Sequence, residues 1–159
     1  MTTRTTGADA ATRLVLATFA ANGAFLAAGD RLVVGHGLTA ARWQVLGAVA
    51  LGDRPLTVAQ IARRMGLARQ SVHASVRRLV DDGLLAFVAN ADHRRSLLVR
   101  LTPAGESAYA EIDARQAQWA NRLADGIDPA ELDAAARLLA RLCGRLTATH
   151  PRSSEEHPT

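Results

Sequence analysis

The sequence has few of the residues on which several classes of protein depend. It contains one cysteine, which excludes an internal disulfide framework. Aromatic residues make up only 4% of the chain, which argues against stacking single-stranded bases on an aromatic surface. No uninterrupted apolar run reaches the roughly 18 residues of a membrane span, and the first ten residues, MTTRTTGADA, lack a secretory apolar segment. We therefore expect a cytoplasmic protein with no membrane partner.

Lysine is also absent, so all 19 basic residues are arginine. From Arg54 to Arg100 the sequence has nine arginines and three aspartates, a net charge of +6. The rest of the 159-residue chain has ten arginines and twelve acidic residues, a net charge of −2, so the formal total of +4 is concentrated in one segment. Such a segment is suited to a phosphate backbone. The alternative is that these arginines only solvate the surface.

Within this basic segment, the residues from Thr57 to about Met65 predict a short helix with defined ends. Thr57 and Gln60 form a T-x-x-Q capping box, which fixes the first turn. Gly66 can adopt the positive φ angle that ends a helix. One face of this helix is apolar, with residues spaced i, i+3, i+4, i+7: Val58, Ile61, Ala62 and Met65.

A second helix is predicted from about Ala68 to Asp82, directly after the glycine turn. Its buried stripe consists of Val72, Val76, Leu79 and Val80. A second stripe, predicted to be exposed, consists of Gln70, His73, Ala74 and Arg77. Polar side chains on such a face can reach base edges and phosphates in a major groove. For an isolated helix a solvated face is the ordinary interpretation, but the turn before it and the hairpin after it favour DNA binding.

The hairpin follows Gly83 and has strands predicted at Leu84–Ala89 and Leu97–Leu101. Both strands are apolar, and the connecting loop from Asn90 to Ser96 is polar and carries Arg94 and Arg95. An arginine at such a tip can enter a minor groove, where the electrostatic potential is most negative. Helix, turn, helix and hairpin in this order are typical of a winged helix-turn-helix that binds duplex DNA.

The ordered set of motifs resembles the winged helix of the MarR family of transcriptional regulators. The resemblance covers roughly Leu14 to Leu146 and is densest from Leu38 to Gly105. The matching residues are Leu38-Thr-x-x-x-Trp43-x-Val45-Leu46, Thr57-Val58-x-x-Ile61-Ala62, Gly66-Leu67, Leu79-x-x-x-Gly83-Leu84, and Arg95-x-x-x-Val99-x-Leu101-Thr102-Pro103-x-Gly105. The chain departs from the family in the wing, where His93 replaces the usual aspartate and Asp92 lies one residue earlier. In the recognition helix, Ala68 and Ala74 stand where the family often has serine and a basic residue.

The resemblance implies a DNA-binding surface on the second helix and the wing. We expect its residues to be Arg69, Gln70, Ser71, His73, Arg77, Arg78, Arg94 and Arg95. Gln70 and His73 are our candidates for base-edge contacts, with Ser71 assisting. Arg77 and Arg78 are predicted to contact the phosphate backbone. Arg95 occupies the family's wing-arginine position, and Arg94 is its rival for the minor groove.

Helices with heptad-like apolar seams are predicted on both sides of the winged helix. They run over residues 9–34 and 103–147, with glycine, proline and capping signals at their ends. These seams exceed what the winged helix at 38–102 can cover, which suggests that an identical chain covers the surplus. The resemblance implies the same homodimer. We therefore expect a mainly α fold with a small β-hairpin, a helical dimerisation region, and disordered tails at 1–8 and 148–159.

No catalytic constellation is evident, so we expect that the protein is not an enzyme and holds no cofactor. The five histidines do not form a metal-ligand spacing with one another or with Cys143. Cys143 lies beside Leu139, Leu142 and Leu146, which predicts a buried small hydrophobic residue. A metal sensor that uses His73, Asp92 or His93 is a weaker alternative.

The resemblance also implies a small-molecule effector that binds where the dimer helices meet the winged helix. Candidate neighbours of such a pocket are Phe25, His36, Trp43 and Trp119, although an ordinary core position is the usual interpretation for each aromatic residue. The resulting hypothesis is a sequence-specific regulator, most simply a repressor relieved by an effector, which binds a pseudo-palindromic operator as a homodimer. The alternative is a winged-helix module that binds proteins and has no specific DNA target.

Overall fold

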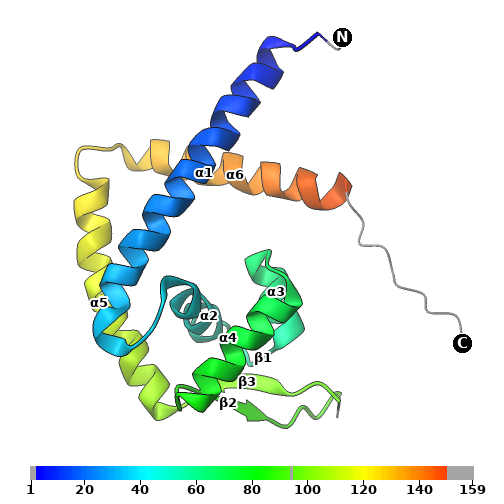
Figure 1. Ribbon diagram of the computed structural model, residues 1–159, viewed down its shortest axis with the longest axis vertical. Helices are drawn as coiled ribbons and strands as arrows, with labels where there is room; N and C mark the ends of the chain where they lie inside the picture. The colour runs from blue at the N-terminus through cyan, green and yellow to red at the C-terminus, as the bar shows by residue number, and fades with distance from the viewer. Residues whose placement is uncertain (1–2, 94, 150–159) are drawn as a thin grey trace, which may run out of the picture. The chain divides into compact units, whose positions relative to one another are not determined.

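The computed structural model describes residues 3–93 and 95–149 (Figure 1). The order of its elements is α1 (Thr6–Val33), the short 3-10 helix η1 (Val34–His36), α2 (Ala40–Ala50), β1 (Leu56–Thr57), α3 (Val58–Met65), α4 (Arg69–Asp81), β2 (Leu85–Val88), β3 (Leu98–Leu101), α5 (Pro103–Ala124) and α6 (Pro129–Thr149). The fold is mainly helical with one small antiparallel sheet, which confirms the predicted class. The chain divides into two compact units, the first ending at Gln116 and the second beginning at Ala117.

The two helices of the helix-turn-helix have the predicted bounds to within about one residue. The Thr57 side chain accepts a hydrogen bond from the Gln60 N–H, and the Gln60 side chain accepts one from the Thr57 N–H, which completes the capping box. Gly66 ends α3 with φ +66°. Because α4 starts only three residues later, the turn between the two helices is short. The predicted capping and turn residues therefore form the motif as expected.

The wing is one part of a three-stranded antiparallel sheet with the order β1-β3-β2. In the hairpin, Leu85 pairs with Leu101 and Val88 pairs with Leu98. Strand β1 adds the pairs Leu56 with Val99 and Thr57 with Leu98. We did not predict β1, because two residues show no alternation of their own. It ties the start of α3 directly to the wing.

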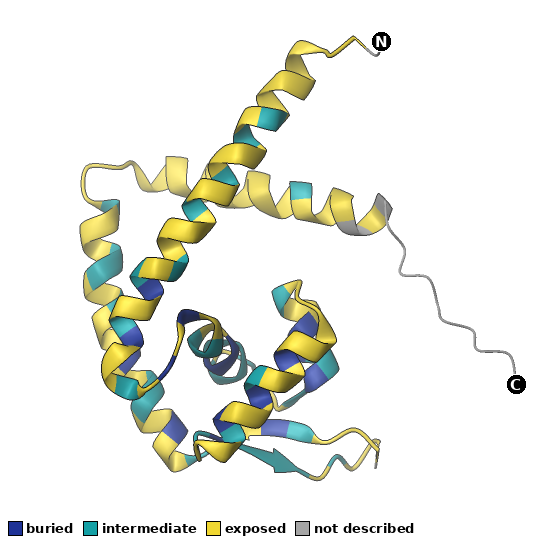
Figure 2. Cartoon of the chain, viewed as in Figure 1, coloured by how far each residue is buried: buried dark blue, intermediate teal, exposed yellow. Residues whose placement is uncertain are grey.

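The core lies between α2, α3, α4 and the sheet (Figure 2). It consists of apolar residues from all of these elements, with Val33 of α1 and Ile112 of α5: Leu38, Val45, Leu46, Val58, Ile61, Ala62, Val72, Val76, Leu79, Leu85 and Val99. The inner stripes predicted for α3 and α4 are buried or half-buried at every position. Opposite faces of these helices therefore remain free for solvent or a ligand.

The junction between the wing and α5 is unusually close. Thr102 caps α5, because its hydroxyl accepts from the Gly105 N–H at 3.0 Å while donating to the Gly83 carbonyl at 2.7 Å. The Thr102 N–H donates to the Leu84 carbonyl at 3.1 Å. A Cβ on Gly105 would collide with that same carbonyl oxygen. Only glycine lets the first turn of α5 lie this close to the backbone that precedes β2.

Helix α1 is attached to the first unit near its C-terminal end. Asp30 accepts a hydrogen bond from the Ala40 N–H at 2.6 Å, so a carboxylate of α1 caps the first turn of α2. Gly29 lies against Ala40, where an added Cβ would come within 2.9 Å of the alanine methyl. Gly29 and Asp30 therefore fix the position of the C-terminal end of α1 against the start of α2.

The bounds of the terminal helices correct two of our expectations. Residues 6–8, predicted to be disordered, form the first turn of α1 because the Thr5 side chain accepts from the Ala8 N–H and caps the helix there. At the other end, α6 continues to Thr149, two residues beyond the predicted end. The remainder of the predicted C-terminal tail, 150–159, and residues 1–2 lie outside the described residues.

Exposed residues make up most of both terminal helices (Figure 2), and several of them are apolar. Phe19 of α1 is 70% exposed and Leu146 of α6 is 68% exposed. Cys143, which we predicted to be buried, is also exposed. By length and composition alone, Thr6–His36 could cross a membrane, since one 18-residue window has a mean hydropathy of 1.3. Scattered polar residues interrupt this segment, so it contains no uninterrupted apolar run of that length.

Candidate nucleic-acid interface

The outward face of α4 presents the side chains that we predicted to contact DNA. Of these, Arg69, Gln70, Ser71, His73, Arg77 and Arg78 are all exposed, while Val72, Val76 and Leu79 on the opposite face are buried. The helix begins at Ala68, which has no side-chain cap hydrogen bond. The first N–H groups of α4 therefore have no side-chain partner at the N-cap, and such groups favour anions.

A hollow of about 260 Å³ brings α4 and the wing together. Three basic side chains from successive turns of α4, those of Arg69, His73 and Arg77, line it with Arg95 and Ser96 of the wing loop. The start of α3 contributes a further wall with Thr57, Val58 and Ala59. The apolar side chains of Phe87 and Leu97 complete the lining. The spacing i, i+4, i+8 places the α4 residues on one side of that helix. Positive groups from two elements thus surround one concave surface, as a phosphate backbone requires.

Arg78 differs from its neighbour Arg77, because part of its charge is neutralised within the protein. Its Nε lies 3.5 Å from an Asp82 carboxylate oxygen. The other oxygen of Asp82 accepts from Arg42 of α2 at 3.1 Å, and Arg42 also donates to the Gly37 carbonyl. The structure therefore places Arg78 in a cluster that connects the end of α4 to α2. Sequence reasoning did not find the Arg42 contact, because 40 residues separate it from Asp82.

The loop of the wing has two local turns. The Asp92 N–H donates to the Asn90 side chain at 3.1 Å, and the Ser96 N–H donates to the His93 carbonyl at 2.9 Å. Arg95 is exposed and faces the hollow beside α4. Arg94, its predicted rival, lies outside the described residues.

This arrangement agrees with a match to a family model. Residues 36–96 match the model for the MarR family, which spans α2, the helix-turn-helix and the wing loop. The chain belongs to the MarR family. It is accordingly a DNA-binding transcriptional regulator and not an enzyme, as the sequence predicted. Regulators of the MarR family bind DNA as dimers, and some of them bind small-molecule effectors.

Similar proteins extend this match beyond the DNA-binding segment. The MarR-family chain is 41% identical over 143 residues to the Mycobacterium tuberculosis protein Rv2011c, an alignment that covers 90% of this chain and 99% of that one. It is 35% identical over 86 residues to the transcriptional activatory protein BadR of Rhodopseudomonas palustris, covering 51% of this chain and 47% of BadR. The structure of CouR from Rhodococcus jostii, bound to p-coumaroyl-CoA, superposes with a TM-score of 0.74 at 20% identity and covers 89% of this chain and 95% of CouR.

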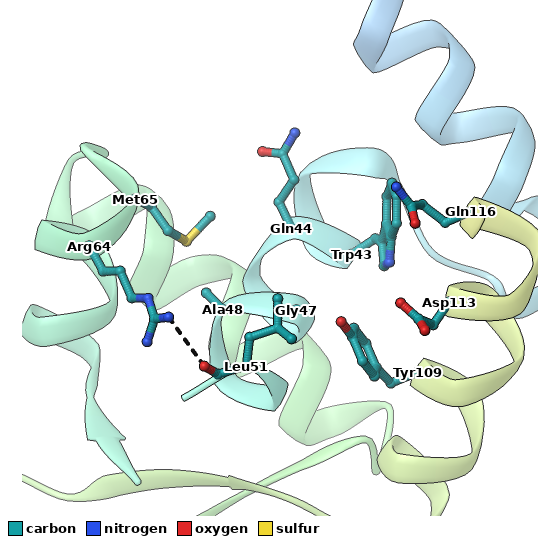
Figure 3. Close-up of a pocket in the computed structure, with 10 residues that line it drawn as sticks. All are labelled: Trp43, Gln44, Gly47, Ala48, Leu51, Arg64, Met65, Tyr109, Asp113 and Gln116. Carbon is teal, nitrogen blue, oxygen red and sulfur yellow. Dashed lines mark hydrogen bonds between the residues drawn. The ribbon is translucent and has the colours of Figure 1, made fainter. Parts of the chain in front are cut away.

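A second cavity, of about 550 Å³, lies between α2, α3 and α5 of this MarR-family protein (Figure 3). Its walls come from one stripe on each helix: Trp43, Gln44, Gly47, Ala48 and Leu51 of α2, Arg64 and Met65 of α3, and Tyr109, Asp113 and Gln116 of α5. Burial raises the pKa of Tyr109, and the nearby charge of Asp113 raises it further. The tyrosine hydroxyl is thus a neutral hydrogen-bonding group at neutral pH.

Among the described residues, one of the four predicted to surround an effector lines this cavity. Trp43 lines the cavity. His36 lies against α5 instead, with its Nε2 atom buried and 4.0 Å from Glu111. Phe25 is exposed on α1, and Trp119 belongs to the second unit. Sequence reasoning missed Tyr109, Asp113 and Gln116 as cavity residues, although their i, i+4, i+7 spacing on one helix face was available as a signal.

The residues named in the metal-sensor hypothesis were also located. His73 lines the basic hollow, whereas Asp92 and His93 are exposed in the wing loop. Over residues 3–93 and 95–149, no group of three or more His, Cys, Asp or Glu side chains could hold a metal ion.

Proposed function

We propose that the protein is a sequence-specific repressor that binds a pseudo-palindromic operator as a homodimer and is released by a small-molecule effector. The observation that carries this proposal is the basic hollow, where Arg69, His73 and Arg77 of α4 meet Arg95 of the wing. A module that binds only proteins has no need for three arginines and a histidine around one surface. The operator is palindromic because a two-fold symmetric protein presents two identical α4 helices.

Within this proposal the exposed residues of α4 and the wing have separate roles. Gln70 and His73 contact base edges, since an amide can bond an adenine with two hydrogen bonds, and Ser71 assists them. Arg69 and Arg77 contact phosphates. Arg95, together with Arg94, supplies the wing contact in the minor groove. Arg78 contributes less than Arg77, because Asp82 already neutralises part of its charge.

The dimer is proposed from the exposed apolar side chains on α1 and α6. In a cytoplasmic protein these faces need a cover, and a second copy supplies the same faces in return. We therefore assign the predicted dimerisation region, 9–34 and 103–147, to the subunit interface and not to a lipid bilayer. Light scattering at micromolar concentration should give about twice 16.9 kDa. A stable monomer would exclude both the dimer and the palindromic operator.

The DNA-binding proposal is tested by footprinting and by a salt titration with duplex DNA. Two half-sites about one helical turn apart are expected. If each protomer neutralises about three phosphates, the slope of log K against log salt is near −5. A slope shallower than about −2, with no footprint, would instead support the protein-interaction module.

The direction of control needs its own test, because one relative favours the opposite output. BadR is named as a transcriptional activatory protein, so activation is the second candidate. A reporter fused to the footprinted promoter should be expressed more strongly when the gene for this protein is deleted. Weaker expression in the deletion strain would establish activation.

A further inference from the structure

The cavity between α2, α3 and α5 has two chemically different ends (Figure 3). At one end Trp43 and Tyr109 present aromatic rings next to the carboxylate of Asp113 and the amide of Gln116. At the other end lie Met65 and Arg64. A molecule that fills the cavity therefore meets a negatively charged aromatic end and a separate, basic end.

Small residues in the middle of α2 keep the cavity open. Gly47 faces the ring of Tyr109, and a Cβ on this glycine would lie 3.6 Å from the Tyr109 Cε2 atom. An alanine would therefore touch the ring, and any larger side chain would occupy the space itself. Ala48 extends the same small surface toward α3. The polar and aromatic side chains of α5 that line the cavity thus face the small residues Gly47 and Ala48 of α2.

The two charged groups of the cavity, Arg64 and Asp113, differ in whether they already have a partner within the protein. Arg64 donates to the Leu51 carbonyl at 3.2 Å, at the C-terminal end of α2, where the helix dipole is negative. Asp113, by contrast, has no arginine or histidine within ion-pair distance among the residues that the structure describes. Arg64 keeps its positive charge at one end of the cavity, and the Asp113 carboxylate is the charged group at the aromatic end.

We propose that this cavity binds an organic cation, with an ammonium group against Asp113 and an apolar body along Gly47, Ala48 and Met65. This inference rests on the proposed effector function and names the chemical class of the effector. The faces of Trp43 and Tyr109 add attraction for the cation, because an aromatic ring has a negative face. An aromatic carboxylate bound in the same orientation would place its charge near Asp113 and be repelled.

The surroundings of Tyr109 support the same assignment. The Asp113 charge acts on the tyrosine hydroxyl strongly enough to raise its pKa, in addition to the effect of burial. Asp113 is exposed to solvent but lies close enough to the Tyr109 hydroxyl for its charge to act on that group. The hydroxyl remains protonated, so it accepts or donates a hydrogen bond and adds no second negative charge.

The test uses two probes with similar apolar bodies and opposite charge, benzyltrimethylammonium and phenylacetate. Their affinities for the full-length protein are measured by isothermal titration calorimetry in the absence of DNA. We expect the cation to bind at least about tenfold more tightly than the anion. The Asp113→Asn variant keeps the shape of the side chain and should lose about tenfold in affinity for the cation.

The matched control is Glu111→Gln, which removes one negative charge from the same helix at a side chain that faces His36 and does not line the cavity. Its affinity for the cation should stay within about twofold of the unsubstituted protein. Tighter binding of phenylacetate, no binding of either probe, or equal losses in both variants would overturn the proposal. If Asp113→Asn does not fold, the comparison of the two probes on the unsubstituted protein decides the question alone.

A second readout separates this inference from the effector function itself. Release of operator DNA is followed by gel shift with each probe. If the anion binds and releases DNA, an effector site exists and the assignment of its charge class is wrong. If the cation binds tightly through Asp113 and does not release DNA, the charge class is right and relief by an effector at this site is wrong.

Discussion

Helices α3 and α4 follow one another in the same motif but are stabilised in different ways. Both ends of α3 are fixed by its own sequence, through the capping box of Thr57 and Gln60 and through Gly66 in the left-handed conformation. Helix α4 begins at Ala68 without a side-chain cap. It is held by the buried face that includes Val72, Val76 and Leu79.

The difference shows how the motif divides its tasks. The supporting helix satisfies its own terminal groups, so its position does not depend on DNA. The recognition helix takes its stability from the core alone, and its first turn and outer face remain available for phosphates and bases. Four sets of substitutions test this comparison, and they follow in decreasing order of expected effect.

The buried face of α4 should matter most. Leu79 is 0% exposed, and Leu79→Ala should lower the free energy of unfolding by about 3 kcal/mol, because it removes buried methyl groups and leaves a cavity. Urea unfolding of the purified protein measures the change. Ser71→Ala on the exposed face is the control and should change it by less than about 0.5 kcal/mol. Equal losses would mean that α4 does not depend on its core face.

The wing arginine should have the next largest effect, and only on DNA binding. Arg95→Ala should weaken binding to operators with A·T-rich flanks by about 1–3 kcal/mol, because a narrow minor groove attracts arginine most strongly. The loss should be smaller with G·C-rich flanks. Arg94→Ala in the same titrations identifies which arginine enters the groove. Equal losses on both flanks for both variants would show that the wing supplies only general charge.

Arginines on the two helices should differ as their roles do. Arg77→Ala on α4 should weaken specific and nonspecific binding alike, by about 1 kcal/mol, and reduce the salt slope by about 1 per protomer. Arg63, on α3, is exposed but does not line the basic hollow. Arg63→Ala removes the same charge and should change the slope by less than half as much. If the two slopes fall equally, the charge of the whole motif matters and its position does not.

The smallest effects concern the helix caps. Thr57→Ala should lower the free energy of unfolding by about 1 kcal/mol, because the Gln60 N–H loses its partner. Ala68→Ser should raise it by about 0.5 kcal/mol or more, because it supplies the cap that α4 lacks. Thermal melting without DNA measures both. If Ala68→Ser has no stabilising effect, the first turn of α4 is already satisfied in some other way.

Local signals explain why much of the fold could be predicted. The capping box at Thr57, the glycine at position 66 and the stripes of α3 and α4 each depend on residues within a few turns of one another, so the sequence displays them directly. The exposed positions of α4 were predicted for the same reason. The MarR motifs added the order of the elements, which no single motif specifies.

The features that were missed depend on contacts between distant residues. Strand β1 exists only because Leu56 and Thr57 meet β3, more than 40 residues later. Asp30 caps α2 from another helix, and the exposure of Cys143 depends on tertiary packing that the local apolar pattern of α6 does not specify. The lining of the cavity also depends on which face of α5 packs toward α2. Trp43 could be predicted as a lining residue from its size, but Asp113 could not, because the sequence does not show which face of α5 is turned to the cavity.

The close contact between Gly105 and the Leu84 backbone makes the junction between the wing and α5 rigid. Three hydrogen bonds of Thr102 hold the same junction, so a displacement of α5 should be transmitted to the wing. Tyr109 lies one helical turn beyond Gly105, so a ligand at its ring would bind close to the place where α5 contacts the Leu84 backbone. Linkage then runs in both directions: a ligand that weakens operator binding by some factor must itself bind the operator-bound protein more weakly by that factor.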